Sequence, residues 1–244
     1  MKGRRRSPAT RVVLEKYYTH LSRHYGPTGW WPGETPFEVA VGAILTQNTA
    51  WRNVELAIGN LKRAKLLTPR AILNCPAATL ESALRPSGYF RVKALRLRSF
   101  CRHLVDQYGG SMARMARRPL AALREELLAV HGIGPETADD ILLYACGHPV
   151  FVVDAYTRRV MSRHGHTAAD IAYEELRSVF EGALPADVAM YKEYHALIVY
   201  AGKDFCRSHP NCEGCPLSTT LLPGQPIMPD AHAAKRPLRR PGQR

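Results

Sequence analysis

The sequence predicts an all-α protein, and three observations support this fold class. Apolar residues recur at every third or fourth position along most of the 244 residues, which is the period of helices with one buried face. Strand-like runs joined by two-residue turns are lacking. The run PVFVV at residues 149–153 is the one extended segment, and it is too short to require a sheet.

The predicted helices follow one another from residue 12 to residue 203. The first, Val12–Tyr25, carries apolar residues at every fourth position. Residues 37–45 form a mostly apolar second helix. The third begins at Trp51 and ends in the basic residues 62–65, which suit a helix C-terminus. Seven more helices are expected at Ala77–Arg85, Phe90–Tyr108, Leu120–Val130, Glu136–Cys146, Ala155–Arg163, Tyr173–Leu184 and Val188–Lys203.

Composition and charge limit the function classes. Apolar residues make up 45% of the chain, which excludes disorder throughout, and no apolar stretch approaches the ~20 residues that span a membrane. The six cysteines do not make a disulfide scaffold and no secretory signal is present, so we expect a reducing, cytoplasmic setting. The formal net charge of +13 indicates a polyanionic partner, with nucleic acid first and an anionic membrane second.

The two ends of the chain differ from its middle. Residues 1–11 hold five Lys or Arg, residues 235–244 hold five more, and neither segment holds an acidic residue. We therefore expect residues 1–11 and 223–244 to be solvated, disordered tails. Such tails would add affinity for nucleic acid that falls as the salt concentration rises.

Two predicted helices are joined by a short loop that contains Gly132, Ile133 and Gly134. The glycines permit positive φ angles, so that Ile133 can insert between the helices while the loop amides point outward. Pro135 suits the first position of the second helix, whose unpaired N–H groups favour an anion such as a DNA phosphate. The alternative is a tight turn between helices that binds nothing.

Asp154 follows the apolar run and precedes the predicted helix Ala155–Arg163. Because Asp is among the best N-cap residues, the simplest interpretation is a cap. A carboxylate at this rigid corner can also face a cleft between two helical lobes, and the two interpretations are compatible. His164 and His166 have the spacing of metal ligands, but we expect them to lie in a solvated turn.

These motifs, taken in order, resemble those of the endonuclease III superfamily of DNA glycosylases. The residues that carry the resemblance are Gly132-Ile133-Gly134, Thr137-Ala138 and Val153-Asp154, with Ile44-Leu45-Thr46-Gln47-Asn48-Thr49, Gly88-Tyr89-Phe90 and Lys93-Ala94 upstream. They lie in a stretch from about Trp30 to Cys215. The resemblance implies a central lobe of residues 36–147 with the hairpin, a second lobe of residues 12–35 and 148–222, and a cleft between the lobes that contains Asp154.

The resemblance also implies base excision repair by a nucleoid-associated monomer acting on double-stranded DNA with a damaged base. The enzyme would flip the damaged nucleotide out of the duplex, at an unstacking cost of a few kcal/mol. Asp154 would stabilise the positive charge that develops on the sugar and would orient water. Gln47 would fill the gap in the base stack, and the hairpin residues 132–134 with Thr137 would hold a DNA phosphate.

Glu136 is the departure that decides the expected reaction. Superfamily members that also cleave the strand have a lysine two residues after the second hairpin glycine, and its amine forms a Schiff base with the sugar. A carboxylate cannot form an imine, so the sequence predicts a monofunctional glycosylase with Glu136 in the base pocket. The alternatives are a bifunctional glycosylase and lyase for oxidised pyrimidines, or a non-catalytic DNA-binding module. For Glu136 itself, a favourable charge at a helix start is the simpler interpretation.

The three tryptophans, Trp30, Trp31 and Trp51, are similar in placement to the aromatic residues of the 3-methyladenine glycosylase branch, which sandwich the extruded base. A purine alkylated at N3 or N7 carries positive charge, and a cation above an indole face gains ~0.5–2 kcal/mol. We therefore predict alkylated purines as substrates, with oxidised or mismatched bases second. The alternative is that these tryptophans are core anchors.

Cys206, Cys212 and Cys215 follow the last predicted helix. In the superfamily a similar run with a fourth cysteine holds a 4Fe–4S cluster, but the fourth position is Leu221 in this chain. His209 lies between the first two cysteines and could complete a zinc site. A loop without metal is the third alternative.

Overall fold

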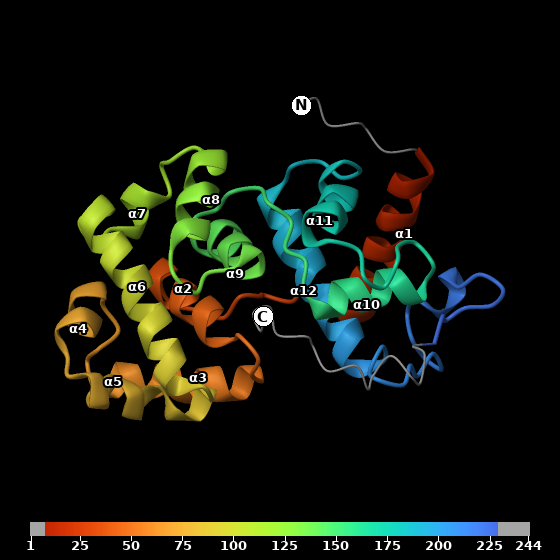
Figure 1. The fold of residues 1–244 in the computed structure, drawn as a ribbon. Coiled ribbons are helices and arrows are strands. Elements are labelled where there is room, and N and C mark those ends of the chain that lie inside the picture. The colour runs from red at the N-terminus through yellow and green to blue at the C-terminus, as the bar shows by residue number, and fades with distance from the viewer. Residues whose placement is uncertain (1–7, 229–244) are drawn as a thin grey trace, which may run out of the picture.

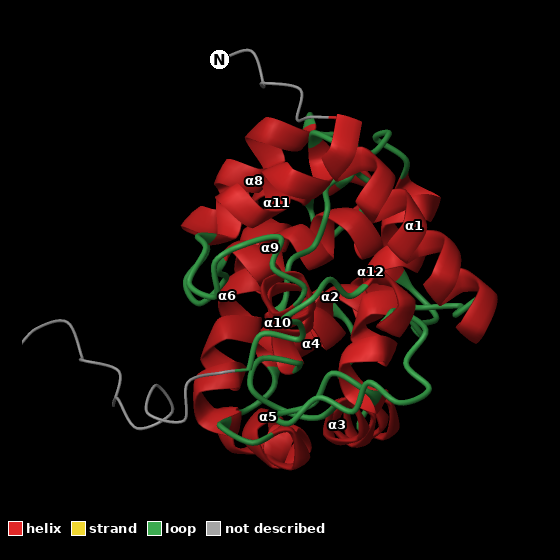
Figure 2. Ribbon diagram, turned by 90° about the vertical axis from the view of Figure 1, so that its right-hand side faces the viewer, coloured by secondary structure: helices red, strands yellow, loops and turns green. Residues whose placement is uncertain are grey.

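The computed structural model describes residues 8–228, and this part of the chain is helical without a β-strand. Figure 1 shows the labelled helices, and Figure 2 shows the same fold coloured by secondary structure. The first half contains α1 Pro8–Tyr25, α2 Pro36–Leu45, α3 Trp51–Arg63, α4 Pro69–Asn74, α5 Ala77–Leu84, η1 Arg85–Ser87, α6 Phe90–Tyr108 and α7 Met112–Met115. The second half contains α8 Leu120–Ala129, α9 Pro135–Asp140, η2 Ile141–Ala145, α10 Ala155–Arg163, α11 Tyr173–Glu181, α12 Val188–Asp204 and η3 Ser218–Thr220. The predicted all-α fold class is confirmed.

The helices form two lobes that lie side by side (Figure 1). Helices α2–α9 make one lobe, and α1 with α10–α12 makes the other. The chain passes between the lobes through residues 26–35 and again through residues 146–154. Helix α12 packs on α1 and α10 in its own lobe and on η2 of the other lobe, so it joins the two.

The second crossing between the lobes is anchored by the run Val150–Val153, whose four side chains are buried. Phe151 stacks on Phe180 of α11 with ring centroids 4.1 Å apart, and its backbone N–H donates to Glu181 at 2.9 Å. Burying an apolar side chain of this size contributes about 1.5–3 kcal/mol. Asp154, which follows this run, is therefore held at a rigid corner.

A buried ion-pair network at Asp139 of α9 fixes the two lobes to each other. Arg124 of α8 donates to both oxygens of this carboxylate, at 2.7 and 3.1 Å. Tyr173 of α11 donates to it at 2.9 Å, and Arg177 of the same helix approaches it at 3.7 Å. Because a buried carboxylate without partners is strongly destabilising, these contacts hold α11 against the hairpin helices.

Several elements differ from the prediction. Helix α1 begins at Pro8, so residues 8–11 are helical rather than part of the N-terminal tail. The short helices α4 and α7 were not predicted. Their N-caps are Thr68 and Ser111, whose side chains accept a backbone N–H of the first turn. The last turn of the hairpin helix, η2, is wound as a π-helix.

The C-terminal end of the described chain folds back on the second lobe. The backbone N–H of Ile227 donates to the carbonyl of Arg163 at 2.9 Å, and the Gln225 amide donates to the carbonyl of His164 at 2.7 Å. The predicted free tail is therefore wrong for residues 223–228. The rest of the two predicted tails, residues 1–7 and 229–244, lies outside the described residues.

The predicted solvated turn is wrong for His164 but not for His166, which is exposed. His164 is buried, and both rings contact the hydroxyl of Tyr17 in α1. His164 is covered because α1, from the opposite end of the chain, packs against it. Such long-range packing leaves no trace in the local sequence.

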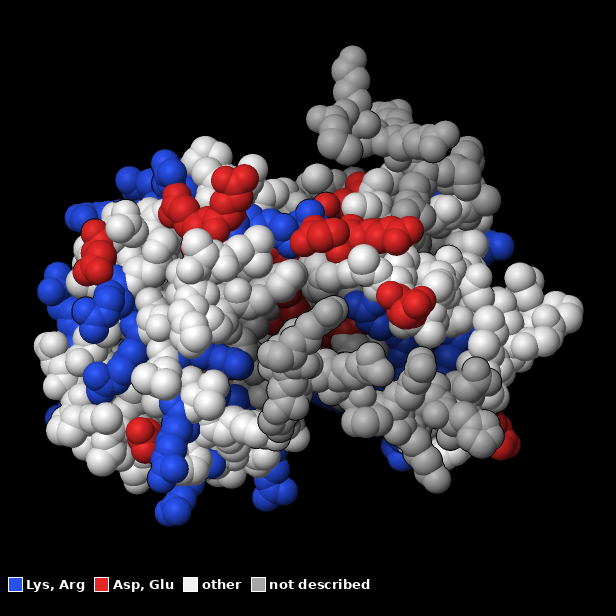
Figure 3. Space-filling model, viewed as in Figure 1, with Lys and Arg blue, Asp and Glu red and all other residues white. Residues whose placement is uncertain are grey.

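Charge is distributed unevenly over the surface. Figure 3 shows Lys and Arg spread over the lobe of α2–α9, whereas Asp and Glu gather along the upper edge of both lobes and in the recess between them. In the described part of the chain, no helix is long and apolar enough to cross a membrane.

Candidate active site

The carboxylate of Asp154 is fixed at the start of α10, where it forms the predicted N-cap. Its Oδ1 accepts hydrogen bonds from the backbone N–H of Thr157 at 2.7 Å and from the hydroxyl of Thr157 at 2.9 Å. Its Oδ2 lies 3.6 Å from Nε2 of His195 in α12. Burial by itself raises the pKa of this carboxyl, but His195 and the bonds from Thr157 outweigh burial, and the pKa lies below its ordinary value. Asp154 is therefore ionised at neutral pH.

Glu136 occupies the first turn of α9, in the opposite lobe. Its side chain is exposed, and it makes no hydrogen bond or ion pair with any residue in the range 8–228. Loss of solvation raises its pKa, and the negative charge of Asp154 raises it further, to about 7. The negative charge of Asp154 therefore acts on Glu136, although the two residues belong to different lobes.

A third carboxyl group, Asp140, lies behind the first two. It is 6% exposed, and its Oδ1 has no hydrogen-bond partner among the described residues. Burial raises its pKa well above the ordinary value, and the charges of Glu136 and Asp154 raise it further. Of the three carboxyl groups, Asp154 is the one whose pKa is lowered, and its fixed negative charge favours a positively charged transition state.

The hairpin and the Gln47 segment are in contact. The Gln47 amide donates to the carbonyl of Gly132 at 3.1 Å and to the hydroxyl of Thr137 at 2.9 Å. Arg96 of α6 donates to the side-chain oxygen of Gln47, and Ile133 is buried as the sequence predicted. Gln47 is thus docked on the hairpin, and it must release these bonds to enter a base stack.

The two hairpin glycines differ in conformation. Gly132 has a φ of +84°, and a Cβ at this position would lie 2.1 Å from Cγ of Arg96. Both the backbone angle and the available space therefore require glycine at Gly132. Gly134 has a φ of −92° and precedes α9 in an extended conformation, so the positive φ expected at both glycines is present at one.

The three tryptophans meet in one cluster. Trp30 lies 5.6 Å from Trp51 with ring planes tilted by 53°, and Trp31 meets Trp51 edge-on at 5.2 Å. A base sandwiched by two rings needs parallel faces separated by about twice the ~3.5–4 Å contact distance between carbon atoms. Because the rings contact one another, the predicted sandwich is closed in this structure.

A cavity of about 270 Å³ lies beside the tryptophan cluster. Its lining consists of Trp30, Trp31, Gly33, Glu34, Thr35, Pro36, Val39, Tyr144 and Lys192. The volume is just below the ~300–1,000 Å³ of typical ligand pockets. The cavity is large enough for a single base, whereas insertion of a base between two of the tryptophan rings would require the rings to move.

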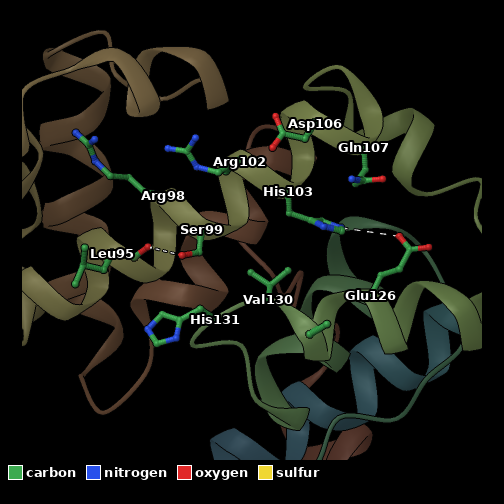
Figure 4. A pocket seen from close by; sticks show the side chains of 11 residues that line it. Leu95, Arg98, Ser99, Arg102, His103, Asp106, Gln107, Glu126, Val130 and His131 are labelled. Atoms are coloured by element: carbon green, nitrogen blue, oxygen red, sulfur yellow. Dashed lines mark hydrogen bonds and ion pairs between the residues drawn. The ribbon is translucent and has the colours of Figure 1, made fainter.

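A separate groove of about 790 Å³ runs between α6 and α8 (Figure 4). Its lining mixes Arg98 and Arg102 with the acidic Glu126, and it reaches the hairpin at His131. Neither Asp154 nor a tryptophan lines it. The groove is therefore not the base pocket.

Tyr89 is a candidate contact residue that the sequence interpretation missed. It is 72% exposed and has a left-handed backbone with a φ of +43°, directly before α6. Its place in the Gly88-Tyr89-Phe90 motif was visible in the sequence, but its exposure was not. Tyr144 and His195 were also missed, because no local pattern sets them apart from core residues.

The cysteine loop does not form a metal site. Within residues 8–228, no three His, Cys, Asp or Glu side chains are arranged to hold one ion. Arg163 donates to the sulfur of Cys206 at 3.3 Å, and burial raises the pKa of the Cys212 and Cys215 thiols. His209 is exposed. The loop thus supplies three cysteines, with Leu221 at the fourth position, and it lacks the fourth cysteine ligand of a 4Fe–4S cluster.

Sequence comparisons find relatives over most of the chain. Residues 41–186 match the HhH-GPD superfamily of base excision DNA repair proteins. A protein of Methanocaldococcus jannaschii, named provisionally as a DNA repair glycosylase, is 48% identical over 212 residues, which are 86% of this chain and 96% of its own. Endonuclease III of Thermotoga maritima is 30% identical over 181 residues, which are 74% of this chain and 79% of its own.

Solved structures share the fold. The 3-methyladenine DNA glycosylase of H. pylori bound to 1,N6-ethenoadenine has a TM-score of 0.66 and 27% identity, over 80% of this chain and 97% of that chain. An endonuclease III trapped as a covalent intermediate with DNA has a TM-score of 0.73 and 23% identity, over 85% and 93% of the two chains. At 23% identity, the similarity to this endonuclease III shows only that the two proteins share a fold.

Proposed function

Because the chain belongs to the HhH-GPD superfamily of base excision DNA repair proteins, we propose that it is a monofunctional DNA glycosylase that removes alkylated purines from double-stranded DNA. The observation that carries the monofunctional part is Glu136. Its carboxyl group shares the cleft with Asp154 at the hairpin position where strand-cleaving relatives need an amine. A carboxyl group cannot form the imine that strand cleavage requires.

Asp154 supplies a fixed negative charge for the reaction. As the bond from the sugar carbon to the base nitrogen breaks, its electron pair leaves with the base and positive charge develops on the sugar. The ionised carboxylate stabilises that charge. Water then adds to the sugar carbon and loses a proton, which leaves an abasic site. An alkylated purine is already cationic and departs as a neutral base, so its departure needs no acid.

The aromatic cluster supports alkylated purines as the substrate class. The ammonium of Lys203 lies 5.4 Å from the centre of the Trp30 ring, so this ring face can accept a cation. A cationic base that displaced Lys203 from this face would gain ~0.5–2 kcal/mol. The similar H. pylori enzyme is a 3-methyladenine DNA glycosylase, which is consistent with this assignment.

The hairpin side of the cleft holds the DNA. The N-terminus of α9 offers unpaired amides for a phosphate, and Arg96 lies over Gly132 beside them. Gln47 and the exposed Tyr89 are the residues that enter or cover the stack when the damaged base leaves it. These contacts position the duplex without reading its sequence.

A panel of duplex oligonucleotides, each with one lesion, tests the proposal. We expect strand breakage at a methylated purine only after alkali treatment, and no covalent adduct after borohydride reduction. Breakage before alkali, or a trapped adduct, would contradict the monofunctional reaction. Excision of oxidised pyrimidines but not of methylated purines would contradict the substrate class.

A bifunctional enzyme is the second candidate, and Lys192 favours it. This lysine lines the 270 Å³ cavity, and burial lowers the pKa of its amine. A less basic amine is a better nucleophile at neutral pH. If the wild-type protein gives a borohydride adduct, Lys192→Ala should abolish it, whereas Lys203→Ala, which removes an amine above Trp30, should leave it.

A further inference from the structure

His195 lies directly behind the carboxylate of Asp154. It projects from the middle of α12 and is 4% exposed. Its Nε2 lies 3.6 Å from Oδ2 of Asp154, and its Nδ1 lies 2.7 Å from the hydroxyl oxygen of Tyr144. The three side chains thus form a line from the cleft into the core.

Tyr144 links His195 to the backbone of α12. Its hydroxyl donates to the carbonyl of Lys192 at 3.3 Å and lies 2.7 Å from Nδ1 of His195, where the direction of the hydrogen bond depends on the His195 tautomer. At the other ring nitrogen the requirement is simpler. A carboxylate oxygen can only accept, so a favourable contact with Oδ2 of Asp154 needs a proton on Nε2.

Each oxygen of Asp154 has a neighbouring side chain that can hold it. Oδ1 accepts two hydrogen bonds from Thr157, and Oδ2 lies 3.6 Å from Nε2 of His195. A carboxylate fixed at both oxygens cannot rotate away from the developing charge, which is the condition for electrostatic preorganisation. The distance of 3.6 Å is long for a hydrogen bond, and such contacts shorten when the substrate closes the site.

A histidine that only fills the core would find partners for both ring nitrogens inside the core. Here Nε2 has no hydrogen-bond partner among the described residues, and it faces the carboxylate. Tyr144 lies on the π-helical turn η2, and its ring contacts Trp31 at 5.1 Å. π-Helical turns are frequent at functional sites. Tyr144 therefore contacts both the base pocket and the residue behind Asp154.

We infer that His195 and Tyr144 are positioning residues, which hold the carboxylate of Asp154 toward the sugar carbon where positive charge develops. The inference rests on the proposed glycosylase activity. His195 acts on the carboxylate directly, and Tyr144 acts through His195 by holding its ring in place.

Single-turnover excision by full-length variants tests the inference, on the lesion that the wild-type protein excises best. We expect His195→Leu to lower the rate by about 10–100-fold, the usual effect of losing a group that orients a reactive one. Affinity for the intact lesion duplex should stay near the wild-type value. His195→Gln should recover part of the rate because its amide can still donate. Tyr144→Phe should lose less than His195→Leu.

A double-mutant cycle separates positioning from a general effect on folding. In the Asp154→Asn background, His195→Leu should cause no further loss, because the two residues act as one unit. His103→Leu is the matched control: His103 lines the groove between α6 and α8, and its removal should leave the rate unchanged. If His195→Leu does not fold, His195→Gln and Tyr144→Phe in the same cycle decide the question.

Several outcomes would overturn the inference. They are a His195→Leu rate close to wild type, losses that add fully to those of Asp154→Asn, or a His195→Gln variant no better than His195→Leu. Excision of another lesion class would contradict the proposed substrate, while the cycle run on that lesion would still test His195. No excision of any lesion would overturn both proposals.

Discussion

The cleft holds two accessible carboxyl groups, one from each lobe, and their surroundings are opposite. Asp154 is 13% exposed, accepts two hydrogen bonds from Thr157 and faces His195. Glu136 is exposed and has no partner within residues 8–228. The pKa of Asp154 is lowered and that of Glu136 is raised to about 7, although Asp154 is the more buried. Donors, rather than exposure, decide which carboxyl group keeps its charge.

The difference indicates a division of tasks. A carboxylate with fixed donors provides charge that does not depend on pH near neutrality, as a developing cation requires. The protonation state of a carboxyl group that titrates near neutral pH depends on the base in the pocket. An empty pocket leaves part of the carboxyl groups neutral, and a cationic base favours the ionised form. Asp154 is thus suited to the sugar, and Glu136 to the base.

The largest expected effect comes from Asp154→Asn. Asn is as good an N-cap as Asp, so α10 should remain folded, while the charge that stabilises the sugar is lost. We expect single-turnover excision to fall by about 100-fold or more, because removing one preorganised electrostatic group typically costs ~10²–10³ in rate. Glu136→Gln is the matched carboxylate-to-amide control and should lose far less. Equal losses in the two variants, or none in Asp154→Asn, would contradict the comparison.

Trp51→Ala should have an intermediate effect that depends on the charge of the lesion. If the aromatic cluster binds a cationic base, its removal should cost ~0.5–2 kcal/mol, or about 2–30-fold in rate, for methylated purines. Neutral lesions should lose less. The ratio of excision rates for a cationic and a neutral purine lesion measures this directly. An unchanged ratio would indicate that Glu136, and not the tryptophan rings, is responsible for the preference for cationic over neutral bases.

The Asp154 side of the cleft was largely predictable from sequence, because its features are local. A carboxylate directly before a helix forms an N-cap whatever the rest of the fold is, and Asp154 does so. The predicted burial of Ile133 in the hairpin is also confirmed. His195 and Tyr144 could not be found in this way. They are 51 residues apart, and their contact depends on how α12 packs on η2.

The aromatic side was predicted in composition but not in geometry. The three tryptophans do gather, but the sequence carries no information on ring orientation, and their faces are tilted or edge-on rather than parallel. The cysteine loop shows the same limit. Spacing suggested a metal, whereas a guanidinium that arrives from α10, Arg163, contacts Cys206.

The smallest expected effect is on stability, and its sign differs between the two carboxyl groups. Glu136 has a folded pKa of about 7 against an ordinary 4.5, so between these values the folded state binds the extra proton. Its contribution therefore becomes less favourable as pH rises from 4.5 to 7, then stays constant. For Asp154 the folded pKa is lowered, so its ionised form stabilises the fold at neutral pH, and this contribution is lost in acid.

The urea midpoints of the two amide variants, measured at pH 5 and pH 8, test these signs. Relative to wild type, Glu136→Gln should gain stability on going from pH 5 to pH 8. The gain should be below about 1 kcal/mol, because solvent screens an exposed charge. Asp154→Asn should be less stable than wild type at both pH values, because Asp154 is ionised throughout this range. If Glu136→Gln showed no pH-dependent gain, neither loss of solvation nor the charge of Asp154 would raise the pKa of Glu136, and the contrast between the two carboxyl groups would fail.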